Sequence, residues 1–281
     1  MATELLHPIS SDLRLARELA DLADRVSMEH FQSRNLGIYV KEDRTPVTDA
    51  DRAVEAAIRE RLAQARPSDS FFGEESGRSG ESRRQWIIDP IDGTANFMRD
   101  IPVWATLISL VVDGHPEVGV VSAPALNRRW WGATGHGAYM DDDLSDSNTA
   151  TDRRIEVSGV DVLENASISY NSLKGWDEAG RLAELVSLER EVWRTRAYGE
   201  FWSYVLVAEG ALEAAGEFDL QPYDMAAIVP IIAEAGGRFT SVDGEEGPWH
   251  GSALATNGIL HEDFLAALRP GGGAADFIEQ A

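Results

Sequence analysis

Apolar residues in the first part of the chain recur at a helical spacing. One stripe, three or four positions apart, predicts a helix over residues 11–32 with a single buried face. A second stripe predicts a helix over 49–65, and Thr48 with Asp51 three positions later is typical of a capping box at its start. The apolar positions of the two stripes are Leu15, Leu19, Leu22 and Val26, and Val54, Ala57, Ile58 and Leu62.

After these helices, short apolar runs bounded by turn residues predict strands. Residues 103–114 and 115–126 are predicted to form a hairpin, because Asp113-Gly114 between them is a favoured hairpin turn. The other strands predicted in this half are 70–75, 86–89 and a pair with a glycine-rich turn within 128–140.

The polar stretch 141–153 has no periodicity, so it predicts an exposed loop and a boundary between two domains, 1–152 and 153–281. Beyond it, strands and helices alternate, which indicates an α+β first half and an α/β second half. The predicted strands are 166–170, 191–198 and 238–242, and the predicted helices are 176–187, 200–214, 224–235 and 261–268. The tail from Arg269 onward is expected to be mobile.

Composition and charge exclude several classes of function. The chain has no cysteine, so thiolate nucleophiles, disulfides and zinc–sulfur sites are excluded. It has no run of about 18 apolar residues and no signal-like start, so we expect a cytoplasmic protein that does not interact with membranes. The net charge of −23 argues against a nucleic-acid partner, and an anionic substrate would be repelled unless bound cations reversed the local charge.

The stretch "WIIDPIDGTANF" places two carboxylates, Asp89 and Asp92, three positions apart on a sharp turn after an apolar run. Asp, Pro and Gly are common in ordinary turns, and a solvated turn explains the motif by itself. A cation site is the alternative, since the turn can aim both carboxylates and the Ile91 carbonyl into one space. Gly93 would let the backbone approach a ligand, and a helix starting near Thr94 would offer free N–H groups to an anion.

Three other stretches carry acids where elements begin or end, and each also has a simple structural explanation. Glu74 and Glu75 suit an exposed strand end, Asp224 suits the first turn of a helix, and Thr48 is a cap. Taken together with Asp49 and the turn, they would supply the oxygen ligands that Mg²⁺ prefers. Cations beside an anion-binding turn are what hydrolysis of a phosphate ester requires. The sequence alone does not show whether these stretches meet.

The four stretches, in this order, resemble the inositol monophosphatase family of metal-dependent phosphatases. "WIIDPIDGTANFMR" is similar to the long signature of that family, with "GEE" upstream and an Asp before "AA" downstream, followed by "EAGG". The resemblance runs from about Leu15 to Leu268 and implies a layered αβαβα sandwich. "VSAPALNRRWWGA" and "RAYGEFWSYVLVAEG" resemble the histidinol-phosphate phosphatase branch most. Tyr223 departs from the family, which usually has Trp there.

The resemblance implies two Mg²⁺ ions and a third, weaker one near Glu74, together with inhibition by lithium. It implies that Glu74, Asp89 and the Ile91 carbonyl hold the first ion, and that Asp89, Asp92 and Asp224 hold the second.

The remaining implied roles concern substrate and water. Asp92, Gly93 and Thr94 would contact the substrate, the last two through backbone N–H groups on its phosphate. Asp49 and Thr94 would orient and deprotonate the attacking water, and Glu217 would contact the alcohol part. Lys41 falls in the N-terminal loop that is mobile in the family.

The expected reaction is hydrolysis of a small phosphorylated alcohol, most simply L-histidinol phosphate, by a homodimer. Glu200, Glu217 and Asp219 suit its cationic groups, Trp202 or Tyr204 could stack on an imidazole unless they only line a buried helix face, and Arg196 is a candidate substrate contact. Two alternatives stay open: an inositol-1-monophosphatase or broad phosphatase of the same family, and a protein-binding regulatory factor with vestigial activity. The full set of acids favours catalysis.

Overall fold

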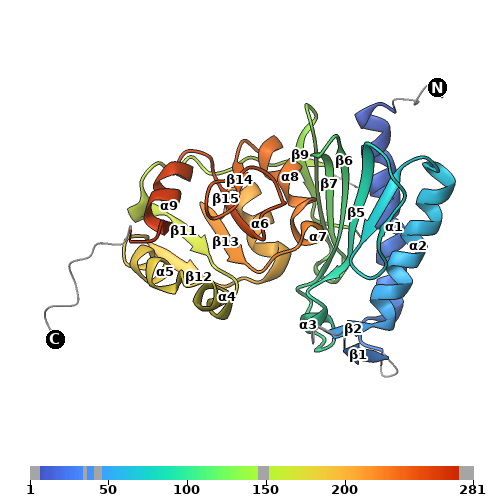
Figure 1. The fold of residues 1–281 in the computed structure, drawn as a ribbon, viewed down its shortest axis with the longest axis horizontal. Helices are drawn as coiled ribbons and strands as arrows, with labels where there is room; N and C mark the ends of the chain where they lie inside the picture. The colour runs from blue at the N-terminus through green and yellow to red at the C-terminus, as the bar shows by residue number, and fades with distance from the viewer. Residues whose placement is uncertain (1–6, 34–36, 41–45, 145–151, 272–281) are drawn as a thin grey trace, which may run out of the picture.

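A computed structural model of the chain describes residues 7–33, 37–40, 46–144 and 152–271. Within this part the elements form five layers, in which helices and sheets alternate from the N-terminal side to the C-terminal side (Figure 1). This arrangement confirms the predicted αβαβα sandwich. Lys41 and the tail beyond Gly271 lie outside the described residues.

The first layer consists of α1 (Ile9–His30) and α2 (Asp49–Ala65), which pack on each other and on one face of a large sheet. Helix α1 buries Leu15 and Leu19 together with three alanines, and such small side chains allow the helix to approach the strands closely. The capping box at the start of α2 is formed as predicted, with Thr48 accepting from the backbone and Asp51 accepting from Thr48.

The large sheet has eight strands in the order β10-β9-β8-β7-β6-β5-β3-β4, and only the β3–β5 pair is parallel. Asp113 and Gly114 both have positive φ, so the predicted hairpin turn between β6 and β7 is confirmed. The strands are β3 (Ser70–Gly73), β4 (Gly77–Ser79), β5 (Arg84–Asp92), β6 (Ala105–Val112), β7 (His115–Ala123), β8 (Arg128–Ala133), β9 (Gly137–Asp141) and β10 (Arg153–Arg154), and β1 (Ile38–Val40) pairs separately with β2 (Pro46–Thr48).

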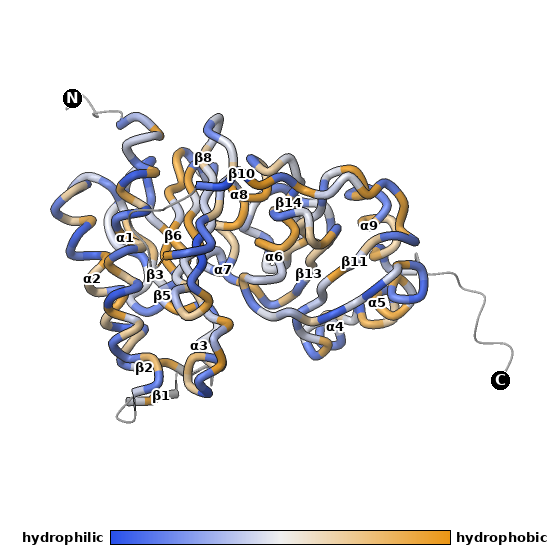
Figure 2. The backbone as a smooth tube through the Cα atoms, turned by 180° about the vertical axis from the view of Figure 1, so that it is seen from behind, coloured by the Kyte–Doolittle hydropathy of each residue, from blue (hydrophilic) through white to orange (hydrophobic). Residues whose placement is uncertain are grey.

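The middle layer joins the two halves of the chain. Helices α6 (Glu200–Ala208), α7 (Pro222–Met225) and α8 (Ile228–Glu234) lie between the two sheets and share one apolar core with β6, β7 and β8. Figure 2 shows apolar segments around α8 and α6. Helix α8 comes so close to the sheet that a Cβ on Gly119 would lie 1.9 Å from the Ala227 carbonyl oxygen, which explains glycine at this position.

The second sheet has the order β12-β11-β13-β15-β14, with β11 parallel to both of its neighbours. Its outer face is covered by α4, α5 and α9 (Figure 1). The elements are β11 (Ser167–Ser169), β12 (Arg194–Arg196), β13 (Ala214–Phe218), β14 (Arg238–Thr240), β15 (Ser252–Thr256), α4 (Leu173–Glu178), α5 (Leu182–Glu189) and α9 (His261–Leu268); short helices are α3 (Thr94–Phe97) and the 3₁₀ turns Pro124–Leu126 and Leu163–Asn165.

Several predicted bounds in the second half are wrong. The predicted helix 200–214 ends at Ala208, because Gly210 takes a left-handed conformation (φ +74°), and β13 follows from Ala214. The predicted helix 176–187 is two helices separated at Gly180, and 224–235 is two separate helices. Strand β15 was not predicted, because its residues SALAT are mostly small and show no alternation. In the predicted loop 141–153, Arg153 begins β10, and 145–151 lie outside the described residues.

Candidate active site

Strand β5 carries two of the predicted acids to its end and turns both toward the same side. Between Asp89 and Asp92 its pairing with β6 shifts, since these residues lie opposite Leu107 and Ala105. Three steps along β5 therefore match two steps along β6, which is a β-bulge. Residues three apart on a regular strand point to opposite faces. The bulge is therefore what allows both aspartates to point to the same side of the sheet.

Asp224 completes this group from the second half of the chain. It lies in the first turn of α7, where Pro222 opens the helix and the Gln221 N–H donates to Asp224 Oδ2 at 2.6 Å. Carboxylate oxygens of Asp89, Asp92 and Asp224 lie within 4.8 Å of one another. The structure thus brings together three of the predicted metal ligands from both halves of the fold.

Burial and mutual repulsion make these carboxylates unfavourable as free anions. Burial raises the pKa of Asp89 well above its usual value, and the charges of Glu74 and Asp92 raise it further. The pKa of Asp92 is raised by burial and by Glu200, and that of Asp224 is raised to about 7, chiefly by burial. Within the described residues, the ion pairs form on other acids, and none of them involves Asp89, Asp92 or Asp224.

Such a set of converging oxygen donors fits a hard divalent cation, which would neutralise the repulsion between them. A second acidic group lies nearby, in which Asp51, Glu74 and Glu75 also have carboxylate oxygens within 4.8 Å of one another. Glu74 follows β3, and its N–H donates to the Ile88 carbonyl at 3.1 Å, so the β3 turn is fixed against β5. The donor chemistry of both groups suits Mg²⁺ better than a soft metal, because it contains no sulfur.

Thr94 forms its closest contacts with Asp51 and not with the predicted Asp49. Its hydroxyl lies 3.0 Å from Asp51 Oδ1 and 3.0 Å from the Ile91 carbonyl oxygen. Asp51 is fully buried, and its other oxygen accepts from Thr48 N–H at 2.8 Å. Asp49 is half-buried one position into α2, and its N–H donates to the Gly37 carbonyl. The structure thus pairs Thr94 with Asp51 instead of Asp49, and Asp51 is a candidate site residue that the sequence analysis missed.

The turn after β5 has the geometry that the sequence predicts for it. Gly93 is left-handed (φ +86°), and a Cβ there would lie 2.9 Å from the Val103 carbonyl oxygen and 3.1 Å from Glu200 Cγ. Helix α3 begins at Thr94, as expected, and the first N–H groups of a helix have no partner within it. Ile91 N–H donates to Asp89 Oδ1 at 2.9 Å, which holds the Ile91 peptide beside the acids.

Glu217 lies at the edge of this site, on β13. Its Oε2 accepts from Asn171 Nδ2 at 2.7 Å and from the Tyr204 hydroxyl at 3.3 Å. Burial, together with the charges of Glu200 and Asp224, raises the pKa of Glu217 to about 8. Within the described residues no hydrogen bond reaches Oε1 of Glu217, so this oxygen is available to a ligand.

The other side chains predicted to contact the substrate form contacts within the protein. Arg196 is exposed at the end of β12, and its guanidinium donates to the Thr195 carbonyl at 2.6 Å. Tyr204 is buried with its hydroxyl on Glu217, so it offers no open face for stacking. Trp202 packs edge-on against Tyr198, and Tyr223 packs edge-on against Phe72.

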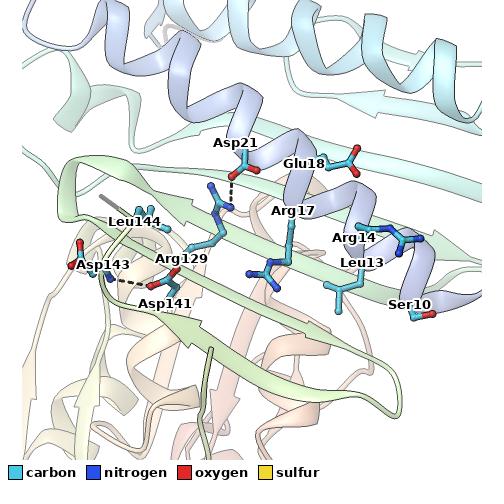
Figure 3. Close-up of a pocket in the computed structure, with 10 residues that line it drawn as sticks. All are labelled: Ser10, Leu13, Arg14, Arg17, Glu18, Asp21, Arg129, Asp141, Asp143 and Leu144. Atoms are coloured by element: carbon cyan, nitrogen blue, oxygen red, sulfur yellow. Dashed lines mark hydrogen bonds and ion pairs between the residues drawn. The ribbon is translucent and has the colours of Figure 1, made fainter. Parts of the chain in front are cut away.

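A separate surface pocket between α1 and strands β8 and β9 has a different chemistry (Figure 3). The Arg129 guanidinium there donates to Asp21 at 2.7 Å and to Asp24 at 2.6 Å, and Arg17 lies 4.0 Å above the Trp131 ring. These cations are occupied in holding α1 against the sheet, so this pocket serves the fold. The candidate active site is the acidic group at the C-terminal end of β5 and the start of α7.

The model of the inositol monophosphatase family matches residues 9–271, and the chain belongs to that family. It is 51% identical over 261 residues to a histidinol-phosphatase of Streptomyces coelicolor, covering 92% of this chain and 96% of that one. It is 52% identical to a histidinol-phosphatase of Mycobacterium tuberculosis, covering 92% and 98%. The solved structure of the suppressor protein suhB from Bartonella henselae matches with a TM-score of 0.82 at 29% identity, over 93% of this chain and 99% of that one. Within the described residues no helix is long and apolar enough to cross a membrane.

Proposed function

We propose that the protein is a Mg²⁺-dependent phosphatase that hydrolyses L-histidinol phosphate to L-histidinol and phosphate in histidine biosynthesis. The observation that carries this proposal is the identity of 51–52%, over 92% of the chain, to two histidinol-phosphatases. The buried group of Asp89, Asp92 and Asp224 supports the metal-dependent chemistry. We also propose that the enzyme acts in the cytoplasm as a homodimer, as the family resemblance implies.

Two sets of ligands would hold the cations. Glu74, Asp89 and the Ile91 carbonyl would bind one ion, and Asp89, Asp92 and Asp224 would bind another, with Asp89 shared between them. Bound cations would neutralise the phosphate, lower the pKa of a bound water and stabilise the leaving alkoxide.

The residues around the turn would orient the reactants. Thr94 Oγ1 directs its own proton toward Asp51 or Ile91, so its lone pairs can accept a hydrogen bond from the attacking water. Asp51 is fixed at both oxygens, and it would keep the Thr94 hydroxyl in this orientation. The N–H groups of Gly93 and Thr94 would hold the phosphate oxygens.

The cationic alcohol part of the substrate would lie toward Glu217. Asn171 and Tyr204 fix one oxygen of this carboxylate and leave Oε1 for the ammonium group. Glu217 precedes Asp224 by seven residues, on the strand whose end faces the acids. The ammonium group and the bound cations would lower the raised pKa of Glu217 and keep it ionised, so a charge-assisted hydrogen bond here would favour histidinol phosphate over an uncharged alcohol phosphate.

The proposal is tested by phosphate release from L-histidinol phosphate with Mg²⁺ and after treatment with EDTA. EDTA should abolish the reaction, and Mg²⁺ should restore it. Asp92→Asn keeps the bulge but removes a charge from the ligand set, so it should lose most of the turnover. The proposal fails if EDTA-treated protein or this variant hydrolyses the substrate at the untreated wild-type rate.

A further inference from the structure

Glu55 is a buried carboxylate on α2 to which the proposed reaction assigns no role. It is 3% exposed, and it lies one helical turn after Asp51 on the same face of the helix. Within the described residues it forms no ion pair, although burying a carboxylate without a cation is costly. The turn that it contacts carries two further acids, Glu74 and Glu75, so its presence needs a specific reason.

Both oxygens of Glu55 accept from the backbone of the turn between β3 and β4. Oε2 accepts from the Glu75 N–H at 2.8 Å, and Oε1 accepts from the Ser76 N–H at 2.9 Å. These two consecutive N–H groups belong to the turn 74–76, which carries Glu74. A bidentate carboxylate on two adjacent amides fixes the turn in one orientation.

The neighbouring strand is shaped to admit this side chain. A Cβ on Gly73 would lie 2.2 Å from Glu55 Oε2 and 2.4 Å from Glu55 Cδ. Any larger residue at 73 would displace the carboxylate from the turn. Gly73 also pairs with Ile88 of β5. The packing of Glu55 on Gly73 therefore joins helix α2, the turn 74–76 and the strand that leads to Asp89.

We infer that Glu55 is a positioning residue for the cation site: it fixes the turn 74–76 and so sets where Glu74 presents its carboxylate. The inference rests on the proposed Mg²⁺ site. Helix α2 then serves the site at two points, with Asp51 on Thr94 and Glu55 on the Glu74 turn. Removing the Glu55 carboxylate should weaken binding of the cation more than binding of the substrate.

The experiment compares Mg²⁺ binding to metal-free wild type, Glu55→Gln and Glu55→Ala by calorimetric titration without substrate. Gln keeps one acceptor oxygen but loses the charge and the second acceptor, so it would hold the turn 74–76 less firmly, and Ala would not hold it at all. We expect Glu55→Gln to bind Mg²⁺ about three- to tenfold more weakly, and Glu55→Ala more weakly still. The kcat of Glu55→Gln should recover at high Mg²⁺, with the KM for substrate unchanged.

Glu213→Gln is the matched control, because Glu213 is also a buried glutamate that accepts from a backbone N–H, that of Ser167, in the second sheet. It should lower the thermal midpoint without changing Mg²⁺ affinity. If Glu55→Ala does not fold, Gly73→Ala, which crowds the same carboxylate, should reproduce the weaker Mg²⁺ binding.

Equal Mg²⁺ affinity in wild type and Glu55→Gln would overturn the inference and leave the proposed function standing. An equal loss in Glu55→Gln and Glu213→Gln would also overturn it, because the effect would then be a general loss of stability. A wild-type protein that binds no Mg²⁺ would instead contradict the proposed function itself.

Discussion

Thr94 joins the end of the bulged strand to helix α2. Its hydroxyl is 3.0 Å from both Asp51 Oδ1 and the Ile91 carbonyl oxygen, so its orientation is set from two elements. Because the backbone N–H groups at 93 and 94 do not depend on this side chain, Thr94→Ala would leave phosphate binding in place. The expected loss is in the orientation of water, which acts on the transition state.

We therefore expect Thr94→Ala to lower kcat by about one to three decades while changing KM little. Steady-state rates of phosphate release at saturating Mg²⁺ provide the measurement. Thr94→Ser, which keeps the hydroxyl, should retain most of the rate. An unchanged kcat with a much higher KM would make Thr94 a plain binding residue.

Glu217 gives a prediction about specificity at the same scale. Loss of a charge-assisted hydrogen bond costs roughly 1.5–3 kcal/mol, so Glu217→Gln should reduce kcat/KM for histidinol phosphate by about one to two decades. Inositol 1-phosphate has no ammonium group, so it should lose less. The two substrates are measured with both proteins at one pH and one Mg²⁺ concentration. Equal losses on both substrates would remove Glu217 from the specificity argument.

Single residues also show where reasoning from sequence stops. The "DPIDGT" turn and its neighbouring acids were found from the sequence, and the structure brings Asp89, Asp92 and Asp224 together. Asp51 was missed because a capping box explained it completely, and the structure shows that it also accepts from Thr94. The local contact of Asp51 with Thr48 can be predicted from their spacing, but its second contact, with Thr94, lies 43 positions away and leaves no sign in the sequence.

At the scale of elements, the position of the acids depends on the irregular end of strand β5. The bulge between Asp89 and Asp92 cannot be seen in the alternation of apolar residues, because it is defined by pairing with β6. Strands β13 and β15 were missed for a related reason. Their small residues carry little intrinsic preference, and their central places in the second sheet decide their conformation.

Helix α9 supplies a prediction about pH, since it begins at a buried histidine. His261 Nε2 lies 3.1 Å from the Thr240 hydroxyl, which itself donates to the Ser241 carbonyl, so Nε2 carries the proton. Thr256 Oγ1, which accepts from Gly258 N–H, lies 2.9 Å from Nδ1 and donates to it. This assignment gives a neutral ring, and burial lowers the pKa of His261 to about 4.

A folded pKa below the ordinary 6.5 means that the unfolded chain takes up the proton first. The contribution of His261 is therefore fully present above pH 6.5 and is lost as the pH falls toward 4, by roughly 1–3 kcal/mol in all. Urea midpoints at pH 7.5 and 5 measure it, with His261→Gln as the reference because Gln does not titrate. The acid sensitivity should be smaller in His261→Gln, and equal sensitivity in both proteins would contradict a neutral buried ring.

At the scale of the whole molecule, the two halves meet along α6, α7 and α8 (Figure 1). The acids Asp89, Asp92 and Asp224 lie where β5 and α7 meet. A chain with a net charge of −23 repels a phosphate ester overall, and cations bound at the candidate metal site would reverse the sign locally. The same acidity suits a substrate that also carries positive charge. The fold and the charge thus favour a phosphorylated cation over a neutral sugar-alcohol phosphate.

The most direct test of the substrate assignment is the ratio of kcat/KM for L-histidinol phosphate to that for inositol 1-phosphate. Both are measured by phosphate release with the wild-type protein in saturating Mg²⁺ at pH 7.5. We expect a preference for histidinol phosphate of at least about one to two decades, the value of one charged contact. A preference for inositol 1-phosphate, or equal values for the two, would contradict it.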